Sequence, residues 1–174
     1  GHNDYDLWFS DYLGAKCKLH FFGKQSSRTV IDSTSQVGFA DAYPLLLISQ
    51  ASLDDLNSRL NNHQVSMAQF RPNIVVDHTA AFEEDTWQHI RIGEVEFEVK
   101  TPCSRCVFTT VDPITGCKHD KKEPLTTLKT YRQVPRGEVI FGQNLIALNQ
   151  GQIKQGDTVE VLSSQPPLTL KSSN

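Results

Sequence analysis

The sequence lacks any apolar run near the ~20 residues that a membrane-spanning helix needs, and no signal peptide opens it. It also lacks a basic surplus, since 17 lysines and arginines stand against 20 acidic residues, for a net charge of −3. A nucleic-acid binder usually carries a basic surplus or a clustered basic stripe. We therefore expect a cytoplasmic protein that contacts neither a membrane nor nucleic acid.

The chain has no methionine at its start, and Met67 is the only one in the sequence. We therefore expect Gly1-His2 to be a cloning remnant and the chain to be an excised piece of a longer protein. Its 174 residues suffice for one domain with its own core, and an apolar fraction of 38% is ordinary for a globular protein.

No Gly-x-Gly-x-x-Gly or Gly-x-x-x-x-Gly-Lys motif occurs, and strands do not alternate with helices as in a dinucleotide-binding fold. Apolar runs and alternation instead predict strands over 16–22, 45–48, 73–76, 89–100 (a hairpin turning at Gly93-Glu94), 107–111, 141–148 and 158–162. Helices are expected over 4–13 and 53–60, the second capped by Ser49 or Ser52. This pattern predicts a mainly β protein with peripheral helices, built as a barrel or as a packed pair of sheets.

Three segments are expected to be irregular. Residues 23–38 are polar and predict a loop, and residues 112–116 combine Asp, Pro, Thr and Gly in strong turn chemistry. The polar tail over 163–174 carries Pro166-Pro167 and resembles a linker.

Two of the four cysteines lie in one segment, Thr101-Pro102-Cys103-Ser104-Arg105-Cys106, between two expected strands. Without a signal peptide we expect reduced thiols. The thiolate is the form that binds a metal or attacks a substrate, and the positive charges of Arg105 and Lys100 would favour it. Ser104 adds a hydroxyl and a loop N–H for anionic oxygens, so this segment is the strongest candidate site.

Other interpretations of these cysteines stay open. Each could be a small buried apolar residue, as free cysteines often are. Cys103 and Cys106 could form a structural zinc site with Cys117 and His119, although the Cys-x-His spacing is unusual for zinc. A thioredoxin-like redox pair is disfavoured because such a pair normally begins a helix beside a βαβ unit.

A second candidate site is Phe70-Arg71-Pro72-Asn73. The planar fork of Arg71 suits a phosphate, a carboxylate or the amide edge of a pterin, and Asn73 can both donate and accept hydrogen bonds. The alternative is a surface arginine beside an asparagine turn. The acidic run around Glu83-Glu84-Asp85 is interpreted as solvated, and no placed Ser-His-Asp arrangement is visible.

Several motifs, in order from about residue 39 to residue 162, resemble the MOSC domain family. They are Ala51-Ser52-Leu53-x-x-Leu56, Phe70-Arg71-Pro72-Asn73, Cys103-Ser104-Arg105-Cys106-x-x-Thr109-Thr110-Val111-Asp112-Pro113-x-Thr115-Gly116, Glu123-Pro124-Leu125-x-Thr127-Leu128, Phe141-Gly142-Gln143-Asn144 and Gly156-Asp157-x-Val159. Within the family the chain most resembles bacterial YcbX-like proteins and is similar to the mitochondrial amidoxime-reducing component.

The resemblance implies a MOSC-type β-barrel that binds the molybdenum cofactor, a molybdopterin. It implies that Cys106, the second cysteine of the motif, is the catalytic residue and the protein ligand of molybdenum. The residues that match pterin- and phosphate-binding positions are Arg71, Asn73, Ser104 and Arg105. Asn144 is a further candidate for a cofactor contact, at a position where some relatives have Tyr. The implied activity is reduction of N-hydroxylated small molecules, including N-hydroxylated bases.

The resemblance also implies parts that this chain does not contain. Electrons would come from an iron–sulfur domain or protein, whose cluster lies in a C-terminal domain that is missing here. Residues 1–30 are expected to hold the start of the excised piece and a remnant of the N-terminal MOSC barrel, 31–163 the MOSC domain, and 164–174 a linker tail.

Three alternative functions remain. MOSC domains also hold the cofactor for sulfur transfer in cofactor sulfurases. The Cys-x-x-Cys could belong to a structural zinc module, or the chain could be a β-barrel interaction domain with buried cysteines.

Overall fold

A computed structural model of the chain describes residues 3–21, 28–30, 33–61 and 64–171. The chain divides into two compact units, Gly1–Ala42 and Tyr43–Asn174. The first contains helix α1 (Asn3–Leu13), and the second contains all the described strands. The domain boundaries expected after residues 30 and 163 stay predictions.

Helix α1 confirms the predicted N-terminal helix and is followed by Gly14, whose φ of +61° suits a glycine after a helix end. The strand expected over 16–22 is wrong for residues 16–21, and residue 22 lies outside the described part. The Cys17 N–H donates to Ser10 Oγ at 3.0 Å, and the Leu19 N–H donates to Asp6 Oδ1 at 2.7 Å. These backbone groups therefore bond to side chains of the helix instead of to a neighbouring strand.

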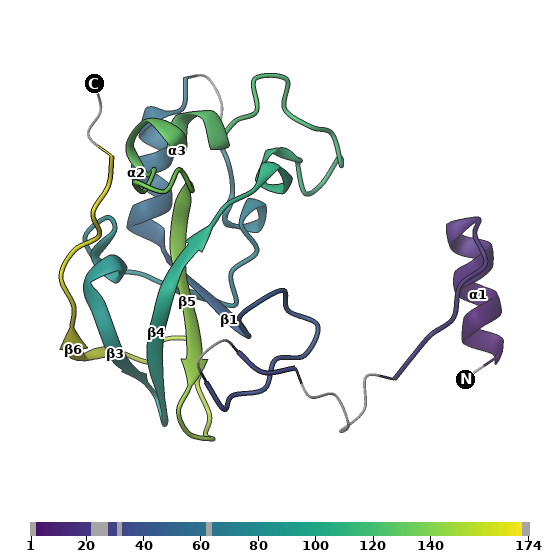
Figure 1. The fold of residues 1–174 in the computed structure, drawn as a ribbon, viewed down its shortest axis with the longest axis horizontal. Coiled ribbons are helices and arrows are strands. Elements are labelled where there is room, and N and C mark those ends of the chain that lie inside the picture. The colour runs from purple at the N-terminus through teal and green to yellow at the C-terminus, as the bar shows by residue number, and fades with distance from the viewer. Residues whose placement is uncertain (1–2, 22–27, 31–32, 62–63, 172–174) are drawn as a thin grey trace. The chain divides into compact units, whose positions relative to one another are not determined.

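The second unit is built on one six-stranded sheet with the order β2-β1-β5-β4-β3-β6, which forms a half-barrel (Figure 1). Its strands are β1 (Leu45–Ser49), β2 (Ile74–Val76), β3 (Trp87–Ile92), β4 (Val95–Ser104), β5 (Ile140–Ala147) and β6 (Val159–Ser164). Among the described strands, only β1 and β2 pair in parallel. This confirms the mainly β fold with peripheral helices and the predicted β3–β4 hairpin.

The two faces of the sheet contribute to separate apolar cores. Leu47, Ile90 and Leu145 belong to one core, which includes residues from all six strands. Ile48, on the opposite face of β1 from Leu47, packs in a second core with residues of α2 (Gln50–Arg59) and α3 (Leu125–Tyr131). The two helices lie on the same side of the sheet (Figure 1). The packing of their apolar side chains in the second core holds them against the sheet.

Helix α2 confirms the helix that the apolar spacing predicted over 53–60. Leu53 and Leu56, on its inner face, are buried. Its cap is Ser49, whose Oγ accepts the Ser52 N–H at 3.1 Å. The cap satisfies one of the donors that the first turn of a helix leaves unpaired.

The strand predicted over 107–111 is wrong, since Val107–Thr110 forms the 3₁₀ helix η3. The two threonines explain the difference. Thr109 Oγ1 donates to the Cys106 carbonyl at 2.9 Å, and Thr110 Oγ1 donates to the Val107 carbonyl at 2.7 Å. Such local bonds from hydroxyls compete with strand pairing.

The tail that the sequence suggested to be a linker is hydrogen-bonded to the rest of its unit at several positions. Residues 163 and 164 belong to β6, and the Gln165 N–H donates to the Thr86 carbonyl at 2.7 Å. Farther along, the Lys171 N–H donates to the Gln133 carbonyl at 2.7 Å. Among the described residues, no helix has the length and apolar character to cross a membrane.

Candidate functional site

Hydrogen bonds and strand pairing connect one row of predicted site residues across four strands. Asn73, just before β2, receives the Leu46 N–H on its Oδ1 and donates its own N–H to the Leu46 carbonyl, both at 2.9 Å. Leu46 stands opposite Asn144 in β5, and Asn144 stands opposite Thr101 in β4. The Asn144 amide lies 3.5 Å from the Pro102 carbonyl. The structure therefore places Asn144 beside β4, the strand that carries Cys103, and Asn73 beside β1 in the same row.

Arg105 joins the cysteine segment to the second candidate site. Its Nη1 donates to Cys103 Sγ at 2.8 Å, and its Nη2 donates to the Phe70 carbonyl at 2.8 Å. Its guanidinium carbon also lies 5.2 Å from the centre of the Phe70 ring. Both ends of its fork therefore contact protein groups. Lys100 makes a different contact, to Glu98 Oε1 at 3.0 Å.

Cys106 stands directly before η3, and its side chain is exposed. Ser104, also exposed, ends β4 opposite Ile140, and the Arg105 N–H donates to the Val139 carbonyl at 2.7 Å. The backbone on the N-terminal side of Cys106 is thus fixed by β5, while η3 fixes the other side. The thiol is therefore presented in the short segment that joins β4 to η3.

Arg71 follows η1 (Met67–Gln69) in the left-handed region, with a φ of +56°, and its N–H donates to the Met67 carbonyl at 3.2 Å. A non-glycine residue in this region is uncommon and is often functional. The Arg71 side chain is exposed and makes no hydrogen bond or ion pair to a described residue. Of the two candidate arginines, Arg71 is the one whose fork can meet an anion from solvent.

A close backbone approach shapes the neighbouring Phe141-Gly142-Gln143-Asn144 motif. Gly142 has a φ of +81°, and a Cβ added there would lie 2.6 Å from Ile48 Cγ1 and 2.8 Å from the Leu47 carbonyl oxygen. The register between β4 and β5 also shifts beside it. Only glycine fits here without strain, and the irregularity sets where Asn144 lies.

Cys117 and His119, the other half of the zinc alternative, line a cavity of about 920 Å³ together with Lys118 and Lys121. Cys103 and Cys106 are not among its lining residues. Over the part of the chain that the structure describes, no three His, Cys, Asp or Glu side chains gather as a metal site would require. The zinc alternative therefore has no support from the geometry.

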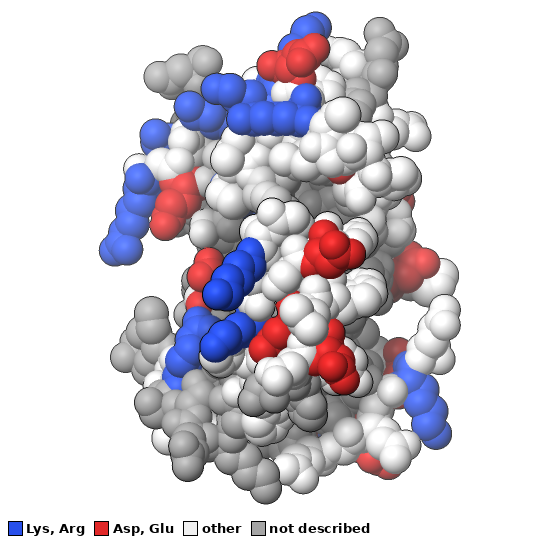
Figure 2. All heavy atoms as spheres, turned by 90° about the vertical axis from the view of Figure 1, so that its right-hand side faces the viewer, with Lys and Arg blue, Asp and Glu red and all other residues white. Residues whose placement is uncertain are grey.

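Figure 2 shows lysine and arginine side chains gathered near the top of one face, beside acidic ones.

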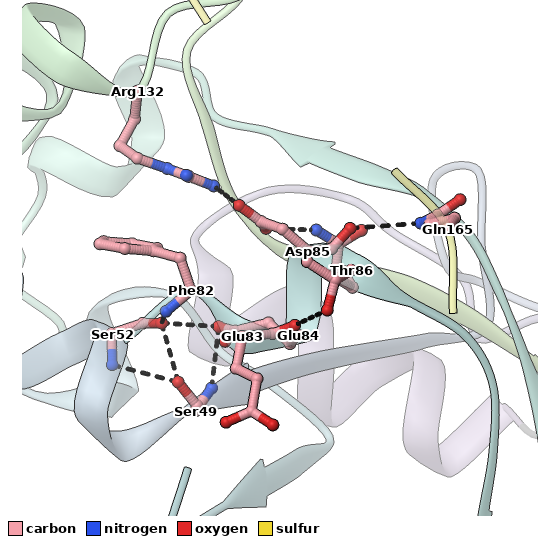
Figure 3. Close-up of polar contacts among 10 residues, drawn as sticks. Ser49, Ser52, Phe82, Glu83, Glu84, Asp85, Thr86, Arg132 and Gln165 are labelled. Atoms are coloured by element: carbon pink, nitrogen blue, oxygen red, sulfur yellow. Dashed lines mark hydrogen bonds and ion pairs between the residues drawn. The ribbon is translucent and has the colours of Figure 1, made fainter. Parts of the chain in front are cut away.

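The interpretation of Glu84 and Asp85 as solvated acids is wrong, because both are buried in η2 (Glu83–Thr86). Glu84 Oε1 accepts the Ser49 N–H at 3.2 Å and the Ser52 hydroxyl at 2.8 Å (Figure 3). Burial raises the pKa of Glu84 above its usual range, and those hydrogen bonds oppose the rise.

Asp85 lies in a second buried polar group beside the first. Its Oδ2 pairs with Arg132 Nη2 at 2.7 Å, and its Oδ1 accepts from Gln143 Nε2 at 2.6 Å. Figure 3 shows Arg132 reaching Asp85 from one side and Gln165 approaching from the other. Sequence reasoning missed this group, because only the acidic run was visible and its partners lie far along the chain.

A half-barrel sheet with few helices, which carries an exposed Cys106 before η3 and an exposed Arg71 after η1, defines a mainly β domain of the MOSC type. The model of the MOSC domain family matches residues 34–160, which is well over half of the chain, and the chain belongs to this family. This confirms the resemblance seen in the motifs.

Similar curated proteins support the same assignment. Mitochondrial amidoxime-reducing component 1 of Mus musculus is 41% identical over 170 residues, which cover 89% of this chain and 49% of the relative. The protein of the same name from Homo sapiens is 46% identical over 134 residues, or 73% of this chain and 39% of the relative. The molybdenum cofactor sulfurase of Oryza sativa subsp. japonica is 34% identical over 170 residues, covering 87% of this chain and 20% of the relative.

The chain spans about half the length, or less, of the curated relatives it matches. The expected cytoplasmic location is wrong in the light of these matches, since the amidoxime-reducing relatives are named as mitochondrial. Reduced cysteines indicate a reducing compartment but do not distinguish one such compartment from another.

Proposed function

We propose that this chain is the molybdenum-cofactor-binding domain of an oxidoreductase that reduces amidoximes and other N-hydroxylated small molecules. The observation that carries the proposal is the position of Cys106. Its exposed thiol lies in the short segment between β4 and η3, whose backbone is held by the bond from the Arg105 N–H to the Val139 carbonyl on one side and by η3 on the other. A thiolate is a soft ligand suited to a redox transition metal.

The residues around Cys106 fit a molybdopterin, an anionic cofactor with hydrogen-bonding edges. Exposed Arg71 offers a planar cationic fork, and exposed Ser104 offers a hydroxyl. Asn73 and Asn144 lie in the row that leads across the sheet to the cysteine segment. These groups would hold the pterin and its phosphate, and Cys106 would ligate molybdenum.

The chain itself supplies binding and orientation. Arg105 keeps the cysteine segment against the Phe70 carbonyl, and its charge adds to that of Arg71 in offsetting the anion. When bound, the cofactor would supply the metal for cleavage of the N–O bond. Overall, the N-hydroxylated compound takes up two electrons and two protons and leaves as the amine or amidine and water. An iron–sulfur domain or protein would deliver the electrons, and the relatives' names favour a mitochondrial location.

The test is turnover of an aromatic amidoxime by the chain, produced in a host that makes molybdenum cofactor and supplied with a chemical one-electron reductant. We expect amidine to form with the wild type, no turnover with Cys106→Ser, and a milder loss with Cys103→Ala. Cys117→Ser is the matched control, because Cys117 is exposed but lies in a different loop. Equal rates for Cys106→Ser and Cys117→Ser would overturn the proposal.

The match to a cofactor sulfurase favours one second candidate, a domain that holds the cofactor for sulfur transfer. This alternative predicts that the wild type contains molybdenum cofactor but forms no amidine under any reductant. Amidine formation that depends on Cys106 rules it out.

A further inference from the structure

We propose that the buried group of Asp85, Arg132 and Gln143 positions the cysteine segment for cofactor binding. The proposal rests on the proposed function for its cofactor, but its mechanical part concerns this chain alone. None of the three residues reaches the exposed site itself, since all are at most 5% exposed. They act through the strand between the buried group and the site, so they are positioning residues.

The first connection runs through the Gln143 side chain. Gln143 is fully buried, and its amide donates to Asp85 Oδ1 at 2.6 Å. In β5 it stands opposite Pro102, the residue before Cys103. Gly142 and Asn144 flank it, so a shift of this side chain would move both the close backbone approach and a candidate cofactor contact.

The second connection runs through the backbone of Arg132. Its side chain pairs with Asp85 at 2.7 Å and lies 4.2 Å from the centre of the Phe82 ring. Its carbonyl accepts the Ile140 N–H at 2.9 Å, and Ile140 stands opposite Ser104. The adjacent Val139 carbonyl holds the Arg105 N–H at 2.7 Å.

The two connections converge on β5 from 140 to 143, which pairs with the segment that carries both cysteines. A buried charge pair contributes little net stability compared with an apolar pair of similar shape, because desolvation offsets the attraction. It does impose a fixed geometry, since a buried acid must meet its partners at defined positions. The group is therefore suited to setting the register of β5 at the site.

The neighbouring Glu84 offers a matched control. It is buried in the same 3₁₀ helix and bonds to other buried groups, Ser49 and Ser52, at the start of α2. Glu84→Gln therefore perturbs a comparable polar group whose side-chain hydrogen bonds run to Ser49 and Ser52 and not to a residue of β5 (Figure 3). Gln143→Met removes the amide at similar side chain length.

The experiment measures amide hydrogen exchange of Arg105 in the labelled chain, and separately the molybdenum content of chain made in a cofactor-producing host. We expect Arg105 to exchange roughly tenfold faster in Gln143→Met and to change by less than about twofold in Glu84→Gln. Molybdenum per folded chain should fall roughly tenfold in Gln143→Met alone, as for supporting residues around metal sites.

Equal exchange rates in the two variants, or full molybdenum in Gln143→Met, would overturn the inference. If Gln143→Met does not fold, the double variant Asp85→Leu/Arg132→Met serves instead, because it replaces the buried pair without leaving a lone charge. A wild type without molybdenum overturns the proposed function. The positioning role is then decided by the exchange rates alone.

Discussion

Substitution of Gly142 by alanine should be costly because two independent features of the structure forbid a side chain there. The residue has a φ of +81°, and an added Cβ would lie 2.6 Å from Ile48 Cγ1 and 2.8 Å from the Leu47 carbonyl oxygen. Holding a non-glycine residue in the left-handed region costs about 1–2 kcal/mol. Forcing an extra carbon into a packed interior adds about 1–3 kcal/mol.

The two costs together reduce the free energy of unfolding by about 2–5 kcal/mol, which lowers Tm by about 5–15 °C in a domain of this size. Gly156→Ala is the matched control. Gly156 has a similar φ of +92°, but an added Cβ would meet nothing within 4 Å. The difference between the two variants therefore isolates the steric cost beside Ile48.

The assay is thermal unfolding followed by circular dichroism, with wild type, Gly142→Ala and Gly156→Ala at the same concentration. We expect Gly142→Ala to lose clearly more than Gly156→Ala. Equal losses in Tm would refute the reasoning, because they would show that β5 can move away from β1 without cost.

Three other predictions concern stability and its dependence on pH. Burial raises the pKa of Glu84, so its protonated form stabilises the fold fully below the ordinary pKa, and this stability is lost as pH rises through the raised pKa. We therefore expect acidification from neutral pH to add a stabilising contribution from Glu84 to the wild-type Tm, and Glu84→Gln to remove that contribution. Leu56→Ala, at a fully buried position, should cost about 2–5 kcal/mol in denaturant unfolding. Asn73→Ala should cost about 1–2 kcal/mol, because the Leu46 N–H loses its acceptor.

The control for Leu56→Ala comes from the same helix. Asp54→Ala lies on the exposed face of α2 and should change the free energy of unfolding by less than about 0.5 kcal/mol. A pH profile of Glu84→Gln that is parallel to the wild type would show that another group causes the dependence. Retained stability in Asn73→Ala would mean that water replaces the lost acceptor.

Most of the sheet could be predicted from sequence because its strands obey simple burial patterns. Ile90, Ile92, Val95, Phe97 and Val99 alternate with polar residues, and all five are buried in one core. Helix α2 shows its apolar face equally plainly. Where one side of a strand or helix is buried and the other is exposed to solvent, the spacing of the apolar residues is enough to predict the element.

Two strand predictions failed because local polar groups decided the backbone. Apolar residues at 17, 19 and 21 alternate, yet the backbone of Cys17 and Leu19 bonds to side chains of α1. At 107–111 the threonine hydroxyls close 3₁₀ turns onto the carbonyls before them. Apolar spacing does not report either kind of bond.

At the candidate site, the residues proposed from sequence stay predictions, and the sequence did not indicate the contacts that they make. The structure brings Asn73, Asn144 and the cysteine segment into one row, which the motif order alone does not imply. The role of Arg105 at the cofactor phosphate stays a prediction, and no sequence pattern indicated that its fork contacts Cys103 and the Phe70 carbonyl. Gln143 and Asp85 are 58 residues apart, and no local pattern predicts such a pairing.

The measurement that tests the central claim most directly is the molybdenum content of the purified chain. Elemental mass spectrometry should compare wild type with Cys106→Ser and Cys103→Ser, all made in a host that supplies molybdenum cofactor. The account predicts near-stoichiometric molybdenum in the wild type, a large loss in Cys106→Ser, and a smaller loss in Cys103→Ser. Wild-type molybdenum that is unchanged in Cys106→Ser, or zinc in place of molybdenum, would contradict it.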